Sequence, residues 1–590
     1  MTSNLTLWPI GNCQVSALVD ERGRFVWGCI PRADGDPVFS SLVDGDADST
    51  GLWDIVLEGH ARTEQHYLAN SPVLMTRLID AQGAVVEILD FCPRFKQMGR
   101  MYRPMAFVRI LRPVAGAPRV RVRLRPADRW GAGEVRRTSG SNHIRYETTA
   151  ASLRLTTDGA PGRIMDETVF RLERPLHLFL GPDEPFEGAV TASVDAMLRQ
   201  TLDEWRHWVR GLATPVEWQE AVIRSAITLK LCQHEETGAI VAAMTTSIPE
   251  HAGSQRNWDY RYCWIRDAYY TVQALNRLGA LDVLEGYLEF LRNVVDDARG
   301  GFVQPLYGIG GETLITEREE PALAGYRGMG PVRVGNAAYT QLQHDVYGQI
   351  VLSSVQAFVD KRLLRMSGRS EFEALEVVGG HAWRVYDQPD AGLWELRTRS
   401  HVHTYSAAMC WAACDRLSRV AGTLGLEDRA AFWQERATTM RDRITTAAWR
   451  PQEQRFSAVF DGDVLDASLI QLLDLRFLSS DDPRFVGTLK SVEAGLRRGS
   501  HMLRYAVEDD FGLPETTFNV CTFWLIEALH YTGRYGEARA LFEEMLARLT
   551  PSGLLSEDID PHTGELWGNF PQTYSLVGLI NCAVLLSRRA

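Results

Sequence analysis

The chain has 590 residues, a net charge of −12 at neutral pH and 16 tryptophans, and 45% of its residues are hydrophobic. This length predicts roughly two to four domains. The acidic balance disfavours nucleic acid and anionic membranes as partners. No apolar run reaches the roughly 18 residues of a membrane helix, and the N-terminus lacks a signal-peptide pattern. Nine scattered cysteines form no disulfide framework. We therefore expect a soluble, cytoplasmic protein with reduced thiols and no membrane partner.

The first 190 residues contain short apolar runs separated by turn residues. Several of these runs alternate apolar and charged side chains with period two, which is typical of strands with one buried face. The pattern predicts an N-terminal antiparallel β-sandwich over residues 1–190. The clearest runs are residues 25–27, 85–89, 106–110, 120–124 and 176–180.

An amphipathic segment over residues 192–213 carries Trp205 and Trp208 and predicts a linker helix within residues 191–215. From residue 216 to residue 590 the hydrophobic period becomes helical. Helices are predicted at 217–232, 265–279, 281–295, 336–360, 371–386, 403–422, 427–447, 484–497, 516–533, 535–548 and 571–587, with a further one near 466–474. About a dozen helices without a fixed repeat length favour a ring of helix pairs over a solenoid. An all-α bundle whose loops carry no chemistry is the alternative.

Two glutamates stand beside large aromatic residues, at Trp394-Glu395 and at Glu557 followed by Trp567. This combination suits the cleavage of bonds between sugars, because aromatic faces stack on a pyranose ring and apolar walls raise the pKa of a nearby carboxyl group. A second carboxylate then activates water or attacks the anomeric carbon. On spacing alone, either glutamate is more often a solvated surface residue.

No cofactor or metal site is predicted. The glycines at 308, 310 and 311 lack the spacing and the preceding strand of a dinucleotide fingerprint. His401 and His403 lack carboxylate partners at ligand spacing, which favours a helix cap or a sugar contact over a metal site.

Several segments, in order along the chain, resemble glycoside hydrolase family 15, the glucoamylase-like family that includes glucoamylases, glucodextranases and trehalases. They are residues 10–20, 31–39, 259–267, 325–336, 394–395 and 554–580. The resemblance extends over nearly the whole chain. It implies a β-sandwich followed by an (α/α)6 barrel as the catalytic domain, which agrees with the periodicity.

The resemblance also implies roles for individual residues. Glu395 matches the general acid and Glu557 the general base of an inverting mechanism, in which the two carboxyl groups stand roughly 6.5–9.5 Å apart. Arg266 and Asp267 match the pair that holds the hydroxyls of the terminal glucose, although a helix N-terminal ion pair is the alternative for these two. The remaining residues expected to bind substrate are Tyr260, Trp264, Arg333, Asn336, Trp394 and Tyr574. Arg504 with Glu515 is either a part of the rim or a surface salt bridge.

Three positions depart from the family pattern: Leu576, where a histidine is common, Met329-Gly330, and Glu515-Thr516. The first two are expected on the leaving-group side, so they bear on the choice of substrate and not on the chemistry.

We expect an inverting, exo-acting α-glucoside hydrolase that releases β-glucose from a small oligosaccharide or disaccharide. Trehalose is slightly favoured over isomaltose-type and malto-oligosaccharides. The alternatives are a disaccharide phosphorylase and a non-catalytic glucoamylase-like regulatory protein. A homo-oligomer is compatible with the sequence, which does not fix the oligomeric state.

Overall fold

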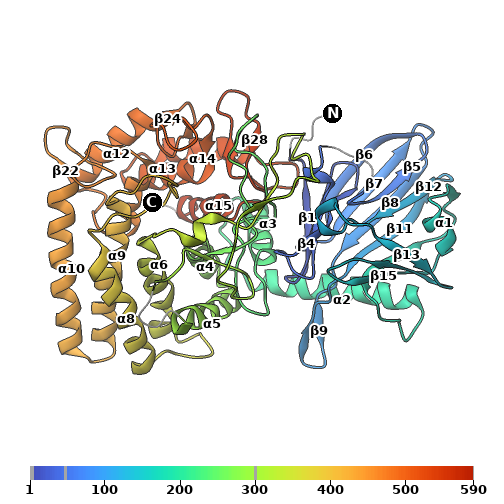
Figure 1. Cartoon of the computed structure of the whole chain (residues 1–590), viewed down its shortest axis with the longest axis horizontal. Coiled ribbons are helices and arrows are strands. Elements are labelled where there is room, and N and C mark those ends of the chain that lie inside the picture. Colours follow the sequence, from blue (N-terminus) through green and yellow to red (C-terminus); the bar gives the residue numbers. More distant parts are fainter. Residues whose placement is uncertain (1–4, 46–49, 298–301, 589–590) are drawn as a thin grey trace.

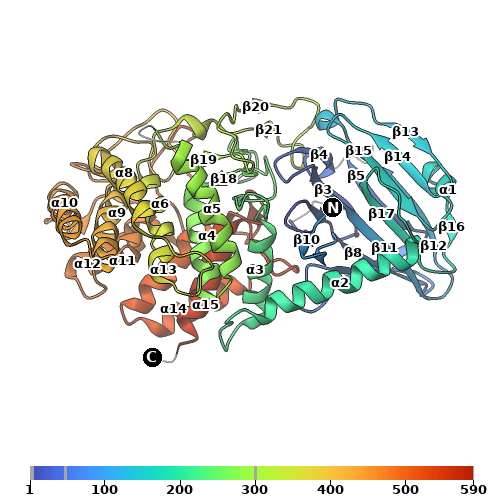
Figure 2. The same ribbon diagram turned by 90° about the horizontal axis from the view of Figure 1, so that it is seen from below.

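The computed structural model describes residues 5–45, 50–297 and 302–588. An antiparallel β-sheet domain lies at one end of an elongated molecule and a helical domain at the other (Figures 1 and 2). This order confirms the predicted fold class. Within the described residues, no helix combines the length and the apolar character needed to cross a membrane.

Two antiparallel sheets form the N-terminal domain. The first has the order β1-β2-β3-β5-β12-β16, with β4 paired to β3, and the second has the order β13-β14-β15-β17-β11-β8-β7-β6. The strands of the first sheet are β1 (Trp8–Gly11), β2 (Ser16–Val19), β3 (Phe25–Ile30), β4 (Asp36–Phe39), β5 (Leu52–Leu57), β12 (Arg119–Arg125) and β16 (Phe170–Arg171). Those of the second are β6 (His60–Tyr67), β7 (Leu74–Asp80), β8 (Val85–Phe91), β11 (Phe107–Ala115), β13 (Arg136–Ser139), β14 (His143–Glu147), β15 (Ser152–Thr157) and β17 (Leu176–Pro182).

The space between the sheets is filled by apolar side chains and by one buried ion pair. Arg109 on β11 and Asp90 on β8 are both fully buried, and the guanidinium Nε donates to Asp90 Oδ1 at 2.8 Å. The same guanidinium lies 4.4 Å from the ring centroid of Phe25. Neighbouring β11 residues Val108 and Ile110 face the other way and pack in a separate apolar cluster. Alternate side chains of β11 therefore point to opposite faces of the sheet and belong to two different buried clusters.

Helix α2 (Val190–Arg210) covers the outer face of the second sheet (Figure 2). Val190, Val194 and Leu198 pack there against apolar residues of β8 and β11. One turn of a helix separates each of these side chains from the next, as expected for an amphipathic helix. The predicted linker helix is thus present, while the domain boundaries at 190 and 215 stay a prediction.

The helical domain is a double ring. Each inner helical segment contacts the next, and the last contacts the first. The inner segments are α4 (Ile265–Arg277), α6 (Asp345–Ser354), α9 (Thr404–Thr423), η4 (Ala467–Ile470) with α11 (Gln471–Asp474), α13 (Asn519–Tyr531) and α15 (Thr573–Leu586). The outer helices are α3 (Gln219–Leu231), α5 (Leu281–Asp297), α8 (Arg369–Val385), α10 (Glu427–Ala448), α12 (Pro483–Leu496) and α14 (Tyr535–Leu546). This is the predicted (α/α)6 barrel.

Burial explains which helices lie inside. Almost every residue of α15 is buried, as expected for a helix with neighbours on all sides. In the outer helix α10, the buried residues Trp433, Ala437, Met440 and Ile444 form a single stripe.

The predicted helix at 336–360 is wrong in its first third. Only a 3₁₀ turn, η3 (Ala337–Thr340), follows Asn336, the chain is then extended, and α6 begins at Asp345. The extended stretch lets the Gln341 side chain donate to the backbone oxygen of Glu395 at 3.2 Å. It also lets Gln343 donate to the Glu395 carboxylate at 3.3 Å. Tertiary contacts thus override the helical period here.

The predicted helix at 516–533 begins later, at Asn519. Its first residues instead form β26 (Thr517–Phe518), which pairs with β27 (Asp558–Ile559). β28 (Leu566–Trp567) pairs with the other edge of β27. This small sheet carries the chain directly after Glu557.

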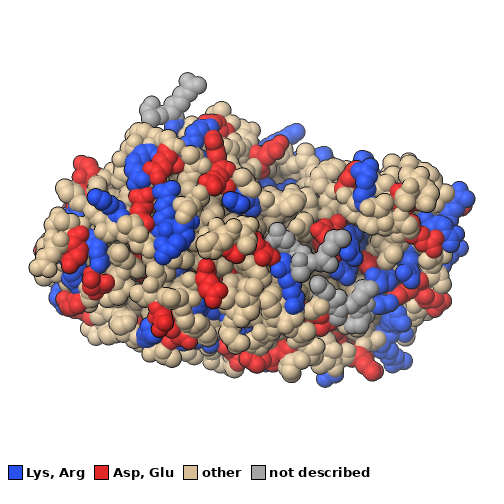
Figure 3. Space-filling view, turned by 90° about the horizontal axis from the view of Figure 1, so that it is seen from above, with Lys and Arg blue, Asp and Glu red and all other residues tan. Residues whose placement is uncertain are grey.

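Acidic and basic side chains are interspersed over most of the molecular face in Figure 3. Ion pairs between exposed groups, such as Arg119 with Glu58 on the sandwich, are frequent. Pairs of this kind contribute little to stability because water screens them.

Removing one partner of the buried Arg109–Asp90 pair should be costly. Asp90→Ala leaves an unpaired guanidinium between the sheets, which we expect to lower the free energy of unfolding by about 3–5 kcal/mol. Urea denaturation followed by tryptophan fluorescence measures this loss. The control is Glu58→Ala, which removes one partner of the exposed pair with Arg119 and should change the value by less than about 0.5 kcal/mol. Equal losses in both variants would contradict the expectation.

Candidate active site

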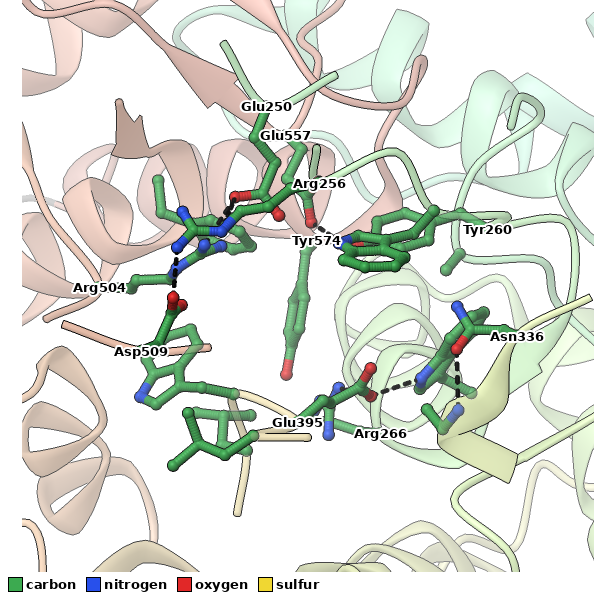
Figure 4. A pocket seen from close by; sticks show the side chains of 18 of the residues that line it. Glu250, Arg256, Tyr260, Arg266, Asn336, Glu395, Arg504, Asp509, Glu557 and Tyr574 are labelled. Atoms are coloured by element: carbon green, nitrogen blue, oxygen red, sulfur yellow. Dashed lines mark hydrogen bonds and ion pairs between the residues drawn. The ribbon is translucent and has the colours of Figure 1, made fainter. Parts of the chain in front are cut away.

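One pocket lies at the N-terminal ends of the inner helices, where the loops from outer to inner helices converge (Figure 4). It contains nine of the ten predicted site residues. The pocket is lined by Ala242, Glu250, Arg256, Trp258, Tyr260, Trp264, Arg266, Asp267, Asn336, Ala338, Gln341, Leu393, Trp394, Glu395, Leu396, Arg397, Arg504, Tyr505, Asp509, Asp510, Phe511, Phe518, Glu557, Gln572 and Tyr574. Glu395 and Glu557 stand on opposite walls (Figure 4).

Glu557 is 3% exposed and uses only one carboxylate oxygen in hydrogen bonds to the described residues. Tyr260 donates its hydroxyl to Oε1 at 2.8 Å, and Gln572 Nε2 lies 3.5 Å from the same oxygen. Burial, followed by the negative charge of Glu250, raises the pKa of the Glu557 carboxyl group above its usual range. The Oε2 oxygen is left for a group inside the pocket.

Gly568 makes this position possible. Its φ is 75°, in the left-handed region that favours glycine, and a Cβ here would lie 2.7 Å from Cβ and 3.1 Å from Oε2 of Glu557. The backbone directly after β28 therefore passes against the Glu557 side chain.

Glu395 shows the same asymmetry on the other wall. Its Oε1 accepts from Trp264 Nε1 at 2.7 Å, from Arg266 Nη2 at 3.0 Å and from Gln343 Nε2 at 3.3 Å. Its Oε2 accepts no hydrogen bond from the described residues. The backbone φ of Glu395 is 57°, a conformation that non-glycine residues adopt mainly where surrounding contacts hold them.

A single segment, residues 259–264, supplies a donor to each of the two glutamates. Its charged pair, Asp259 and Arg261, is fully buried, and Arg261 Nη2 lies 2.7 Å from Asp259 Oδ2. Arg261 Nη1 donates at 2.6 Å to the backbone oxygen of Gly35 in the sandwich. The sandwich therefore fixes the segment that carries Tyr260 and Trp264.

Arg266 and Asp267 occupy the first turn of α4 at the bottom of the pocket. The Arg266 guanidinium also lies 3.8 Å from Asp267 and 3.8 Å from Asp345. Asp267 is 5% exposed, and no side chain of the described residues donates a hydrogen bond to it. Burial raises the pKa of Asp267 to about 7. A buried carboxylate without side-chain donors is suited to accept hydroxyl groups of a ligand.

Aromatic rings form the remaining walls. Tyr260 and Trp264 pack edge to face at 5.5 Å, and Trp394 donates its indole N–H to Asp466 Oδ2 at 3.0 Å. The buried hydroxyl of Tyr574 has no hydrogen-bond partner among the described residues and points into the pocket (Figure 4). Tyr574 also lines a second cavity of about 370 Å³, which lies further along the inner helices toward their C-terminal ends, so its ring closes the inner end of the site.

Arg333, the tenth predicted residue, does not line the pocket, and its predicted role in binding substrate stays a prediction. Its guanidinium donates to the backbone oxygens of Gln255 and Asn257 at 3.0 and 3.1 Å and lies 4.8 Å from the ring of Trp258. It supports the wall formed by Trp258. Asn336 lines the pocket, but its side-chain oxygen caps η3 by accepting from the backbone N–H of Ala338.

The expected rim and leaving-group positions also need correction. Arg504 does line the pocket, but it pairs with Glu250 at 2.6 Å and not with Glu515. Glu515 is exposed and lies 3.3 Å from His251. Leu576 is completely buried in the barrel core, because α15 turns this side chain away from the pocket. Met329 is likewise absent from the lining, and its sulfur accepts from the backbone N–H of Gly253.

Several lining residues had no signal in the sequence. They include Glu250, Arg256, Trp258, Gln341, Asp509 and Gln572. Glu250, Arg256, Trp258 and Asp509 belong to loops without periodicity, whereas Gln341 and Gln572 fall inside stretches predicted as helix.

No cluster of three or more His, Cys, Asp or Glu side chains in the described part of the chain is arranged to hold a metal ion. His403, considered above as a cap or a sugar contact, binds Asp390 through Nδ1 at 2.7 Å, and its side chain does not cap α9. The pocket instead offers two carboxyl groups on opposite walls, each with one oxygen fixed and one free. Such a pair can donate a proton on one side of a bound sugar and accept one on the other.

Comparisons with known proteins agree with this chemistry. Residues 217–584 match glycosyl hydrolases family 15, and residues 5–174 match the trehalase-like N-terminal domain. The chain is 32% identical to a trehalase of Mycolicibacterium smegmatis, covering 98% of this chain and 90% of the relative. It is 31% identical to a trehalase of Thermoplasma acidophilum, covering 96% and 97%.

Among solved structures, a bacterial glucoamylase complexed with acarbose superposes with a TM-score of 0.68. The match covers 100% of this chain and 93% of that structure at 13% identity, so it shows a shared fold. The resemblance predicted from the motifs is confirmed.

Gly568→Ala should abolish most of the activity without unfolding the protein. The new Cβ displaces the Glu557 side chain, and a displacement of about 1 Å costs roughly 10²-fold in rate. Measuring kcat together with Tm separates the two effects. Gly533→Ala is the matched control, because Gly533 has a φ of 85° and open space around it. If both variants lose activity equally, contact with Glu557 is not the reason for the glycine.

Proposed function

The chain belongs to glycosyl hydrolases family 15 and is a glycoside hydrolase acting on α-glucosides, and we propose that it hydrolyses trehalose with inversion of configuration. Glu395 is the general acid and Glu557 the general base. The observation that carries the proposal is the pair of free carboxyl oxygens, one on each wall of a single pocket.

The hydrogen bonds of Glu395 direct its proton. Three donors point at Oε1, so a protonated Glu395 carries its proton on Oε2. From there the proton passes to the glycosidic oxygen as the bond to the anomeric carbon breaks. The leaving sugar departs as an alcohol.

The hydrogen bonds of Glu557 leave room for water. Tyr260 fixes Oε1 at 2.8 Å, so Oε2 can accept a proton from a water molecule on the opposite face of the sugar. That water forms the new bond to the anomeric carbon while Glu557 takes up its proton. Direct attack from the side opposite the leaving group gives β-glucose.

Arg266 and Asp267 hold the glucose that is transferred. Sugar hydroxyls donate to the Asp267 carboxylate, which lacks side-chain donors in the free protein. Binding of this kind is specific, because losing a partner leaves a buried charge unpaired. The rings of Tyr260, Trp264 and Trp394 pack against the apolar faces of the sugar.

Trehalose is favoured because the relatives that match nearly the whole chain are named trehalases and the N-terminal region matches a trehalase-like domain. Glucoamylase-type substrates are the second candidate, because a bacterial glucoamylase shares the fold over the whole chain. A phosphorylase would use phosphate in place of the water and base, and the retained Glu557 argues against it.

Substrate choice can be tested by glucose release from trehalose, isomaltose, maltose, kojibiose and dextrin, each with and without phosphate. We expect trehalose to give the highest kcat/KM, with β-glucose from the attacked ring and α-glucose from the leaving ring appearing in equal amounts at the start of an NMR time course. Activity on maltose or dextrin alone would favour the second candidate. Formation of glucose 1-phosphate would show a phosphorylase.

The acid and base roles predict different responses to the leaving group. Glu395→Gln should lose about 10²–10⁴-fold on trehalose but much less on α-glucosyl fluoride, because fluoride needs little protonation. Glu557→Gln should lose activity on both substrates, since the water still needs its base. Equal sensitivity of the two variants to the leaving group would contradict the assignment.

The pH profile of kcat/KM reports the free enzyme, so it reflects the raised pKa of Glu557. A base acts only when ionised. Activity should therefore fall as the pH drops through a pKa above the usual 4.3 of glutamate. Tyr260→Phe removes a hydrogen-bond donor to the ionised form of Glu557. The acidic limb of the profile, where activity falls at low pH, should therefore shift to higher pH by about 0.4–1 unit, the equivalent of one hydrogen bond. A shift of the acidic limb to lower pH would contradict the role of Tyr260.

Asp267→Asn should lower kcat/KM by a similar factor for every accepted substrate, because Asp267 contacts the transferred glucose. The expected cost is of order 2–4 kcal/mol for a lost charge-assisted contact. A variant that instead re-ranks trehalose, isomaltose and maltose would place Asp267 on the leaving-group side.

A further inference from the structure

A third glutamate lines the pocket on the same wall as Glu557. Glu250 is 4% exposed, and Arg504 Nη2 donates to its Oε2 at 2.6 Å. The Arg256 guanidinium lies 3.9 Å from the same oxygen. Figure 4 shows Glu250 and Glu557 side by side, across the pocket from Glu395.

The backbone around Glu250 is tied to the sheet that follows the base. Pro249 accepts a hydrogen bond from the N–H of Gly568 at 2.8 Å, and Gly568 packs against the Glu557 side chain. The Thr516 hydroxyl donates to the backbone oxygen of Glu250 at 3.0 Å. Glu250 and Glu557 therefore share one rigid frame.

We propose that Glu250 is a third functional carboxylate of the site, a positioning residue that acts on Glu557 through its charge and is itself held in place by Arg504. The proposal rests on the proposed function of Glu557 as the base. It assigns Glu250 no contact with the reacting atoms.

The electrostatic balance at Glu557 supports this assignment. Among the charged neighbours, Glu250 is the largest cause that raises the pKa of Glu557, while Arg504 lowers it. The two residues bind each other, so Arg504 screens part of the charge that Glu250 presents to the base. The charged and titratable groups acting on Glu557 are Tyr260, Arg504, Glu250, Asp267 and Asp558.

A fixed negative charge beside the base has a chemical use. A carboxylate with higher proton affinity takes the proton of the attacking water more effectively, provided that the pH keeps it ionised. Arg504 limits the effect, because its positive charge lowers the pKa of Glu557. The pair thus sets the pH at which Glu557 becomes competent.

The test compares charge-removing variants of both partners by the pH dependence of kcat/KM on α-glucosyl fluoride, which needs little acid assistance. Glu250→Gln keeps an oxygen for Arg504 and removes the charge. The acidic limb of the profile of this variant should shift to lower pH by about 0.5–1 unit. At a fixed pH well below the limb, the ratio of kcat/KM to its plateau value should then be about three- to tenfold higher than in the wild-type protein. Arg504→Gln should move the limb in the opposite direction.

Two controls separate charge from shape. Glu250→Asp keeps the charge and should leave the limb near its wild-type position. Glu515→Gln removes an exposed carboxylate from the same loop region, outside the pocket, and should change nothing. Tm measurements identify variants that fail to fold.

Opposite shifts for the two variants support the proposal. The proposal would be overturned if the acidic limb of Glu250→Gln does not move, or if both variants shift in the same direction. A purely structural role of Glu250 would change the height of the profile and not its position on the pH axis. If the wild-type protein hydrolyses no α-glucoside, the proposed function fails instead, and the two failures are distinguishable.

Discussion

The site depends on one buried ion pair. Asp259 and Arg261 lie at the junction of sandwich and barrel, without exposure to water, and Arg261 reaches back to the backbone of Gly35. The short segment that they hold carries Tyr260 and Trp264, whose polar hydrogens bind Glu557 and Glu395 respectively. A buried pair gives little net stability, but it fixes the geometry. The sandwich thereby helps to position the site, although none of its described residues lines the pocket.

The same segment gives the two glutamates a common design. Each has one oxygen fixed by donors from the protein, and the other oxygen of each accepts no hydrogen bond from the described residues. Chemically identical groups can then perform opposite tasks, because position relative to the sugar decides which one gives a proton and which one takes it. The difference in surroundings is large: Arg266 faces Glu395, whereas Glu250 faces Glu557.

The helical and β periods predicted the two-domain fold well, because buried faces repeat regularly along each element. Both glutamates were identifiable only through the motifs around them. Prediction failed where loop contacts decide the outcome. The stretch before α6 reads as helix, yet Gln341 and Gln343 keep it extended by binding Glu395. Glu250 left no signal, because its role arises only when Arg504, far along the chain, folds against it.

The ring of Tyr574 has a consequence for polymeric substrates. It closes the inner end of the pocket, with a separate cavity behind it, so the proposed activity is expected on a terminal sugar and not on a chain that passes through the barrel. On a glucan, the rate of the proposed activity would follow the number of chain ends and not the mass of polymer. A branched glucan would then be consumed faster than a linear one of equal weight, whereas a disaccharide offers an end on every molecule.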